Sequence, residues 1–509
     1  MVSRAYVRKL DYEIPDRYRN AFYLANAAFF DSTNWFLHRA YEILFPTLKE
    51  DLQCTYKGEK FNDTQIHERL ENVVEILDQC NSIIDVRFPI RRDTGRYETV
   101  RAFRAHHGRL ASSLSLGGLR IHEGITRDHM KALCLLSSMK NHCVGIGMSG
   151  AHGGIKLCPG QYSERELQSV VRQYIFHMSQ KGYCGKNDVI HPDINTSSRH
   201  MDWVSDAHKI YSGETLDVAS VGRPVGSGGV EKFETFAALG AFTALELLLN
   251  EDTILRKIFV DRGIEGKKFV IQGLGKVGRP LALLLVDKGA VCVGVKEREA
   301  YIYDREGIDL KALLRYREEH DSIENYGLAK TDHPDSIFTE DCDILVLAAC
   351  HKSLVCYVAR DVKANIILEA ADGPTTPAAH KILVGKSKLV VPDIYACSGT
   401  NIASYFEYLK HLHRIGALDD NLLRCNKGIF RGHFRREAEC GKAILDSGVG
   451  VGDYAFLKKV LECIFTEICQ GILTNLETYK LGLDVRTAAY ALSVKAMFKN
   501  IYDQKAFPK

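Results

Sequence analysis

A glycine-rich stretch near the middle of the chain, residues 267–297, constrains the fold more than any other feature. A short apolar run leads into three glycines in the spacing GxGxxG, and a segment with helical apolar spacing, a second apolar run and an acid follow in turn. In such a βαβ unit the glycines allow a tight turn and close approach of a pyrophosphate, and the acid receives a ribose hydroxyl. The stretch therefore predicts a dinucleotide-binding unit with the cofactor residues Gly273, Gly275, Gly278 and Glu297. A doubly wound domain whose pocket is idle is the alternative.

Short apolar segments alternate with helical patterns from about residue 222 to residue 393. The predicted strands are residues 269–272, 291–295, 343–348, 365–369 and 389–392. This alternation is typical of a parallel, doubly wound α/β sheet. Outside this region, the apolar spacing predicts helices over residues 21–44, 63–79, 126–140 and 401–424, a strand over 85–90, and a final helix pair within 454–502.

Length and composition narrow the class of protein. At 509 residues the chain is long enough for more than one domain, and its formal net charge of +3 gives no reason to expect a nucleic-acid partner. No stretch is apolar and uncharged for long enough to cross a membrane. The 15 cysteines are scattered and lack a CxxC pair, so we expect reduced thiols, no metal site and an intracellular protein. Acids follow the first basic residues at once, which is atypical of a transit peptide.

Eight motifs then follow one another in a distinctive order. They are GGLRIHEG at 117–124, SGAHGGIK at 149–156, HPD at 191–193, GLGKVG at 273–278, EAADGPTTP at 369–377, PDIYACSG at 392–399, SYFEY at 404–408 and GLDVRTAAY at 482–490. Together they resemble the hexameric glutamate dehydrogenases, within the Glu/Leu/Phe/Val dehydrogenases, and more specifically the animal type. The resemblance implies the oxidative deamination of L-glutamate to 2-oxoglutarate and ammonia, with NAD or NADP as the cofactor.

The resemblance also implies a domain organisation. It places an α/β substrate and oligomerisation domain at 1–215, a Rossmann-type NAD(P)-binding domain at 216–400, a pivot helix with a shortened antenna at 401–470, and C-terminal helices that pack back on the core at 471–509. It implies a homo-hexamer, or a hetero-hexamer with a paralogue, and small-molecule ligands that are amino acids or nucleotides. The resemblance implies a mitochondrial protein. Because the sequence lacks a convincing transit peptide, a cytoplasmic location is the alternative.

Part of the family's active site is present in this chain. By its position in the motifs, Lys140 matches the lysine that holds the substrate α-carboxylate, and Asp193 matches the aspartate that shuttles protons. Ser404 matches the serine near the side-chain carboxylate, and Arg120 is retained. For Lys140 and Asp193 a purely structural role, as a helix-end lysine and as a turn cap after Pro192, is the alternative.

Other positions depart from the family pattern. His152 replaces the catalytic lysine, and an imidazole is mostly neutral at pH 7 because its reference pKa is about 6.5. Leu116 replaces the lysine that binds the side-chain carboxylate, so one charge-assisted bond is absent. On the cofactor side, substitutions give Phe233, Ala237, Lys276, Asp372 and Cys397. We therefore expect a cleft depleted of positive charge.

Three hypotheses about function follow from this pattern. In the first, the chain is a catalytically impaired or inactive hexamer subunit that acts as a scaffold or regulator. In the second, it is an active NAD(P)-dependent dehydrogenase for glutamate or a less acidic amino acid, with His152 as a replacement catalyst. In the third, it senses nucleotides through the glycine motif. The basic run at 431–436 either contacts a partner or nucleotide or is a solvated surface.

Overall fold

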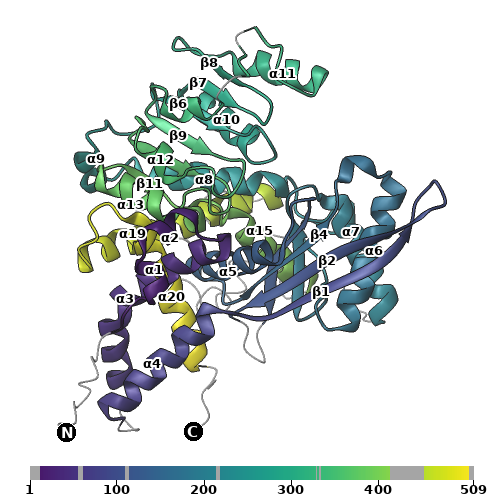
Figure 1. The fold of residues 1–509 in the computed structure, drawn as a ribbon, viewed down its shortest axis with the longest axis horizontal. Coiled ribbons are helices and arrows are strands. Elements are labelled where there is room, and N and C mark those ends of the chain that lie inside the picture. Colours follow the sequence, from purple (N-terminus) through teal and green to yellow (C-terminus); the bar gives the residue numbers. More distant parts are fainter. Residues whose placement is uncertain are drawn as a thin grey trace.

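The computed structural model describes residues 12–55, 61–108, 114–213, 218–327, 329–331, 334–412 and 452–503. The expected antenna and the basic run at 431–436 lie outside these residues. The described chain forms two sheets, each covered by helices and joined through a long C-terminal helix pair (Figure 1). The sequence prediction of two α/β domains, one of them doubly wound, is confirmed.

The first sheet has five strands in the order β1-β2-β4-β3-β5. Strand β2 pairs antiparallel with both β1 and β4, whereas β3 runs parallel to both β4 and β5. Helix α5 covers one face, and α6 and α7 cover the other (Figure 1). The elements are β1 (Cys80–Arg91), β2 (Tyr97–His107), β3 (Ser115–Ile121), α5 (Arg127–Cys143), β4 (Ser149–Lys156), α6 (Glu164–Gln180), β5 (Asp188–Pro192) and α7 (Ser198–Ser212).

Helices at the start of the chain extend the first domain. α3 (Phe29–Thr55) packs against α5, and α4 (Asp63–Asp78) packs back on α3. The start of α4 is fixed by a capping box, in which the Asn62 side chain accepts from the Gln65 N–H and the Gln65 side chain accepts from the Asn62 N–H. Two short helices precede them, α1 (Asp16–Arg19) and α2 (Ala21–Asn26).

The second sheet has six strands in the order β11-β10-β9-β6-β7-β8. The first five are parallel, and only the short edge strand β8 is antiparallel. The five predicted strands of this region are confirmed within a residue or two at each end. The strands are β6 (Lys268–Gln272), β7 (Val291–Lys296), β8 (Tyr301–Tyr303), β9 (Ile344–Leu347), β10 (Ile366–Glu369) and β11 (Leu389–Val391).

Helices cover both faces of this sheet, as a doubly wound fold requires. The helix after the glycine motif, α10 (Gly278–Asp287), lies between β6 and β7, in the order that the sequence pattern predicts. The others are α8 (Phe236–Leu248), α9 (Asp252–Ile258), α11 (Leu310–His320), α12 (Cys356–Ala359), α13 (Pro377–Gly385), α14 (Asp393–Ala396) and α15 (Gly399–His411).

The last two helices tie the domains together. α19 (Asp453–Thr478) packs on α8, and α20 (Val485–Asp503) returns to α3 and α5 of the first domain. On α20, Arg486 pairs with the buried carboxylates Glu369 and Asp393 of the second domain. Two turns later, the Ser493 hydroxyl donates to the Met139 carbonyl of α5 at 2.9 Å. One helix thus holds a fixed point in each domain.

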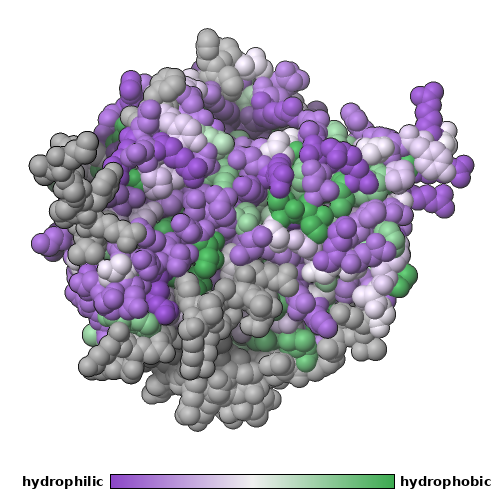
Figure 2. All heavy atoms as spheres, turned by 60° about the horizontal axis from the view of Figure 1, so that its bottom comes forward, coloured by the Kyte–Doolittle hydropathy of each residue, from purple (hydrophilic) through white to green (hydrophobic). Residues whose placement is uncertain are grey.

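On the face shown in Figure 2, the described residues are mostly hydrophilic, with separate apolar groups among them. The large hydrophobic side chains that are exposed are Tyr97, Ile194, Ile210, Tyr211, Val225, Phe259 and Tyr357. Within the described ranges no single helix has the length and hydropathy of a membrane span; α8 and α9 pass that test only as a pair, bent by 82°. The same ranges contain no group of three or more His, Cys, Asp or Glu side chains arranged to hold a metal ion.

Candidate functional site

A cavity of about 740 Å³ lies between the two sheets. The segments that follow the carboxyl ends of β6, β7, β9 and β10 line it on one side, and residues of β3, β4 and the β5–α7 loop line it on the other. Ligands of open α/β sheets bind in the crevice beyond the carboxyl ends of the strands. The cavity is therefore where a ligand of this fold is expected.

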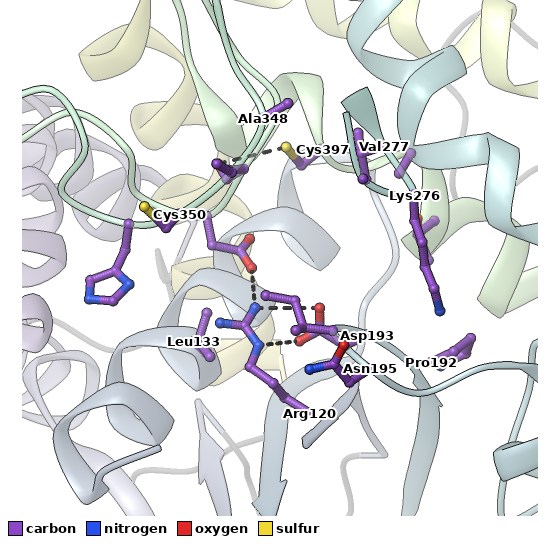
Figure 3. Close-up of a pocket in the computed structure, with 18 of the residues that line it drawn as sticks. Arg120, Leu133, Pro192, Asp193, Asn195, Lys276, Val277, Ala348, Cys350 and Cys397 are labelled. Carbon is purple, nitrogen blue, oxygen red and sulfur yellow. Dashed lines mark hydrogen bonds and ion pairs between the residues drawn. The ribbon is translucent and has the colours of Figure 1, made fainter. Parts of the chain in front are cut away.

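A cluster of four charged side chains occupies the middle of this cavity (Figure 3). Arg120 donates from Nε to Asp193 Oδ2 at 2.9 Å and from Nη2 to Asp372 Oδ2 at 3.2 Å. The other Asp372 oxygen, Oδ1, pairs with Lys140 Nζ. His152 Nε2 lies 3.0 Å from Asp193 Oδ2. The structure thus brings together the predicted residues Lys140, His152, Asp193 and Asp372, although they come from two domains.

Glycines in strand β3 make this cluster possible. A Cβ atom on Gly117 would lie 1.5 Å from the Ala151 carbonyl oxygen, and one on Gly118 would lie 2.9 Å from His152 Cε1. Only glycine allows β3 and β4 to approach this closely, and Arg120 follows two residues later in the same strand. The glycine pair therefore allows β3 and β4 to pack closely, and this close packing lets Arg120 and His152 both contact Asp193.

The cluster is electrostatically balanced. Burial alone would raise the pKa of Asp193, but the charge of Arg120 and the hydrogen bond from His152 hold it well below its ordinary value. Burial would also raise the pKa of Asp372, which Lys140 and Arg120 instead lower. Burial lowers the pKa of His152, so its imidazole is neutral at pH 7. Two cations and two carboxylates remain, and their charges cancel.

The remaining two cations that line the cavity are also engaged. Lys276, in the glycine motif, donates to the Thr196 carbonyl across the cleft. Arg317 lies with its Nε 3.3 Å from Glu297 Oε1, and its Nη1 donates to the Leu274 carbonyl at 3.1 Å. Each lysine and arginine among the described lining residues therefore has a partner in the chain itself. The expectation of a cleft depleted of positive charge rests on Leu116 and His152 in place of two lysines and stays a prediction; the structure adds that the cations lining the cavity are paired.

The glycine motif keeps the shape of a dinucleotide-binding turn. Gly273 has a φ of +90°, which an L side chain rarely adopts, and a Cβ atom on Gly278 would lie 1.9 Å from the Gly273 carbonyl oxygen. A Cβ atom on Gly275 would meet nothing within 4 Å, so the backbone there is open to a ligand. Glu297 accepts from the Leu274 N–H at 2.8 Å, and burial raises the pKa of its carboxyl. These residues fit the pyrophosphate and ribose of a dinucleotide.

Three predicted residues lie outside the cavity lining, namely Gly278 of the glycine motif, Leu116 and Ser404. Leu116 and Ser404 are both fully buried, in β3 and α15 respectively. The Leu116 carbonyl accepts from Asn141 Nδ2 at 3.4 Å, and the Ser404 hydroxyl has no hydrogen-bond partner among the described residues. A role for either side chain in substrate binding stays a prediction.

Sequence reasoning missed two features of the site. Arg317 comes from α11, which carries no motif, yet it neutralises the predicted ribose-binding acid Glu297. His129 and His351 meet across the cleft with their Nε2 atoms 2.9 Å apart, and the ring of Phe29 stacks on His351. Burial lowers the pKa of both histidines, so a neutral pair can share one hydrogen bond. No spacing in the sequence signals either contact, because the partners are far apart along the chain.

Known proteins resemble the chain in both sequence and fold. A family model described as Glu/Leu/Phe/Val dehydrogenase, dimerisation domain, matches residues 80–210, and the model of the Glu/Leu/Phe/Val dehydrogenase itself matches residues 228–437. A mitochondrial glutamate dehydrogenase of Dictyostelium discoideum is 31% identical over 348 residues, which are 67% of this chain and 69% of that protein. An NAD-specific glutamate dehydrogenase of Staphylococcus aureus is 33% identical over 342 residues, 67% of this chain and 80% of that protein.

The fold is likewise that of a solved structure. A hetero-hexameric glutamate dehydrogenase from Thermus thermophilus, in a form with leucine bound, superposes with a TM-score of 0.74 at 24% identity, covering 98% of this chain and 100% of that chain. With the family models matching most of the chain, and with its glycine motif and interdomain cleft in place, the protein belongs to the Glu/Leu/Phe/Val dehydrogenase family of oxidoreductases.

Proposed function

We propose that this chain is a catalytically impaired or inactive subunit of a glutamate dehydrogenase-type oligomer, in which it acts as a scaffold or regulator. The observation that carries the proposal is the state of the cavity cations: Arg120 and Lys140 are held by Asp193 and Asp372, and neutral His152 adds no further charge. A dicarboxylic amino acid would have to bind where no cation among the lining residues is free.

The chemistry of oxidative deamination explains why this matters. A nicotinamide cofactor, when bound by Gly275 and Glu297, supplies the hydride acceptor. The chain must fix the substrate carboxylates with cations and move protons at the α-carbon, the nitrogen and the attacking water. Asp193 can accept a proton only against the charge of Arg120, which lowers its pKa and weakens it as a base. A lost proton-transfer group alone costs about 10²–10⁴ in rate.

The relatives support an oligomeric role. The Thermus thermophilus structure is a hetero-hexamer by its description, and the first domain of this chain matches the family's dimerisation domain. A subunit that keeps the assembly fold and has lost catalytic groups fits such a hetero-hexamer with an active paralogue. The mitochondrial relative supports the same compartment for this chain.

One observation favours a second candidate function, an active dehydrogenase for a less acidic amino acid. The Nε2 atom of His152 bonds Asp193, and its Nδ1 atom has no partner among the described residues. A carboxylate that orients a neutral imidazole is an arrangement used for general base catalysis. Apolar side chains of Ile125, Met130 and Leu133 line the same cavity and suit an apolar ligand.

A direct assay separates these functions. Purified protein is mixed with saturating 2-oxoglutarate and ammonium and with NADH or NADPH, and the absorbance at 340 nm is followed; leucine and glutamate with NAD or NADP test the reverse direction. An active glutamate dehydrogenase serves as the positive control. We expect no change in absorbance with any of these. Brisk turnover of glutamate would refute the proposal, and turnover of leucine alone would establish the second candidate.

Cofactor binding has its own readout. A thermal unfolding series with NAD, NADP and ADP reports binding without turnover, because a ligand of the folded state raises the unfolding temperature. A rise with a dinucleotide, together with an inactive protein, indicates nucleotide sensing through the glycine motif. No rise with any nucleotide indicates a scaffold.

A further inference from the structure

The structure points to Asp372 as the residue that sets which ligands the cleft accepts. We propose that its carboxylate acts as an intramolecular ligand of Lys140 and Arg120 and thereby excludes ligands that carry a carboxylate. This inference rests on the proposed function, since it explains why a cleft that contains two cations does not hold a dicarboxylic acid. It makes Asp372 a specificity-determining residue.

The geometry of Asp372 is that of a bound carboxylate. Its two oxygens are divided between two cations, Oδ1 with Lys140 and Oδ2 with Arg120. Both cations come from the first domain, and Asp372 follows β10 in the second. Their side chains are only 12% exposed, so a ligand carboxylate could reach them only by taking the place of Asp372.

The loop that carries Asp372 is held in place by a buried network. The next residue, Gly373, has a φ of +55°, and its N–H donates to Asp393 Oδ2 at 2.8 Å. Asp393 is fully buried, and its other oxygen accepts from Arg486 Nη1 at 3.1 Å. A Cβ atom on Gly373 would lie 2.5 Å from the ring of Phe29, which closes the other side. Asp372 is therefore directed at the two cations by fixed backbone.

Displacing Asp372 would be unfavourable for a ligand. A carboxylate ligand that took Lys140 and Arg120 would leave the Asp372 carboxylate without a cation, close to the second carboxylate Asp193. Buried charges are tolerated only when they are paired. The same ligand would also break the contacts by which Arg120 and Lys140 join the two domains. The cleft of the unmodified protein therefore accepts neutral ligands in preference to carboxylates.

The test replaces Asp372 by a neutral residue of the same shape. Asp372→Asn frees Lys140 and one side of Arg120, and the probe is glutarate, a dicarboxylate without an amino or oxo group. Isothermal titration calorimetry and thermal unfolding report binding without any redox reaction. Because a charge-assisted bond becomes available, we expect glutarate to bind the variant about 10- to 100-fold more tightly than the unmodified protein.

Three variants provide the controls. Asp453→Asn removes the acid of an ion pair outside the cavity, Lys410–Asp453 at 2.8 Å between α15 and α19, and should leave glutarate binding unchanged. The double variant Lys140→Gln/Asp372→Asn should lose the gain, because the freed cation is gone. Asp372→Ser, a second neutral variant, should show the same gain as Asp372→Asn and guards against the misfolding of one protein.

The outcomes are distinct. Equal glutarate affinity in the folded Asp372→Asn variant and the unmodified protein would overturn the inference, as would a gain that persists in the double variant. Should both neutral variants require refolding, equal yields with and without glutarate would count against it as well, and a higher yield with glutarate would support it. Turnover of glutamate by the unmodified protein would defeat the proposed function instead, and the 340 nm assay detects that separately.

Discussion

Glu407 offers a sharp test of how burial governs stability in this fold. Its carboxylate lies on α15 and is fully buried. It accepts three backbone N–H bonds, from Gly222 at 2.8 Å, Arg223 at 3.2 Å and Val230 at 3.1 Å. It thus holds the loop that leads from the first domain into α8. Burial nevertheless outweighs these bonds and raises the pKa of Glu407 from 4.5 to about 7.

The sign and size of the effect follow from linkage. Between pH 4.5 and 7 the folded chain keeps the Glu407 proton and the unfolded chain loses it, so the contribution of this group to stability falls as the pH rises. Each pKa unit corresponds to 1.36 kcal/mol, so the fall amounts to about 3 kcal/mol. Below pH 4.5 the Glu407 carboxyl is protonated in both the folded and the unfolded chain, so it does not lower the stability. Above pH 7 it is charged in both states, and the loss of stability stays constant.

The variant Glu407→Gln removes this titration. Its amide nitrogen cannot accept the Val230 N–H, which costs about 1 kcal/mol at every pH. Relative to the unmodified protein, the variant should therefore gain about 3 kcal/mol of unfolding free energy between pH 4.5 and 7.5. The measurement is urea unfolding of both proteins at a series of pH values. Taking the difference cancels the other titrating groups, which the two proteins share.

The exposed Glu462 on α19 gives the matched control, since Glu462→Gln changes the same group in a solvated setting. The stability difference measured for Glu462→Gln is the baseline against which the difference for Glu407→Gln is compared. Parallel pH curves for Glu407→Gln and the unmodified protein would refute the reasoning, because they would mean that the buried carboxyl keeps an ordinary pKa.

Two further predictions concern the supports of the site. Gly117→Ala places a Cβ atom 1.5 Å from the Ala151 carbonyl oxygen and should cost at least about 3 kcal/mol of unfolding free energy, measured by urea unfolding. The control is Gly160→Ala, which should be nearly neutral because its Cβ atom meets nothing within 4 Å. Similar losses in both variants would contradict the packing argument. Arg486→Met leaves Glu369 and Asp393 buried without their cation and should cost about 3–5 kcal/mol in urea unfolding. A loss below about 1 kcal/mol would contradict the role of Arg486 as their partner.

Local patterns predicted the framework of this molecule well. The glycine motif and its flanking apolar runs correspond to β6, α10 and β7, because a βαβ unit is encoded within about 30 residues. The helix over 401–424 is seen as α15 up to residue 411, and the rest of that prediction lies outside the described residues.

The contacts of the site could not be predicted in the same way. Lys140 and Asp372 are 232 residues apart, and the sequence showed an aspartate at 372 without showing that it would bind the cations of the other domain. Arg317 approaches Glu297 only because α11 folds back over the strand ends. Each of these pairs depends on how whole domains pack, which no periodicity encodes.

Helix α20 has a consequence for the distance between the two halves of the cleft. Arg486 and Ser493 are seven residues apart, about 10 Å along a helix, and an α-helix of this kind does not stretch. The first is bonded to the Glu369 carboxylate at the end of β10, just before the loop of Asp372, and the second is bonded to the Met139 carbonyl next to Lys140. The length of α20 between these two anchor points therefore sets the spacing of the two domains at the cleft, and with it the distance between Asp372 and Lys140.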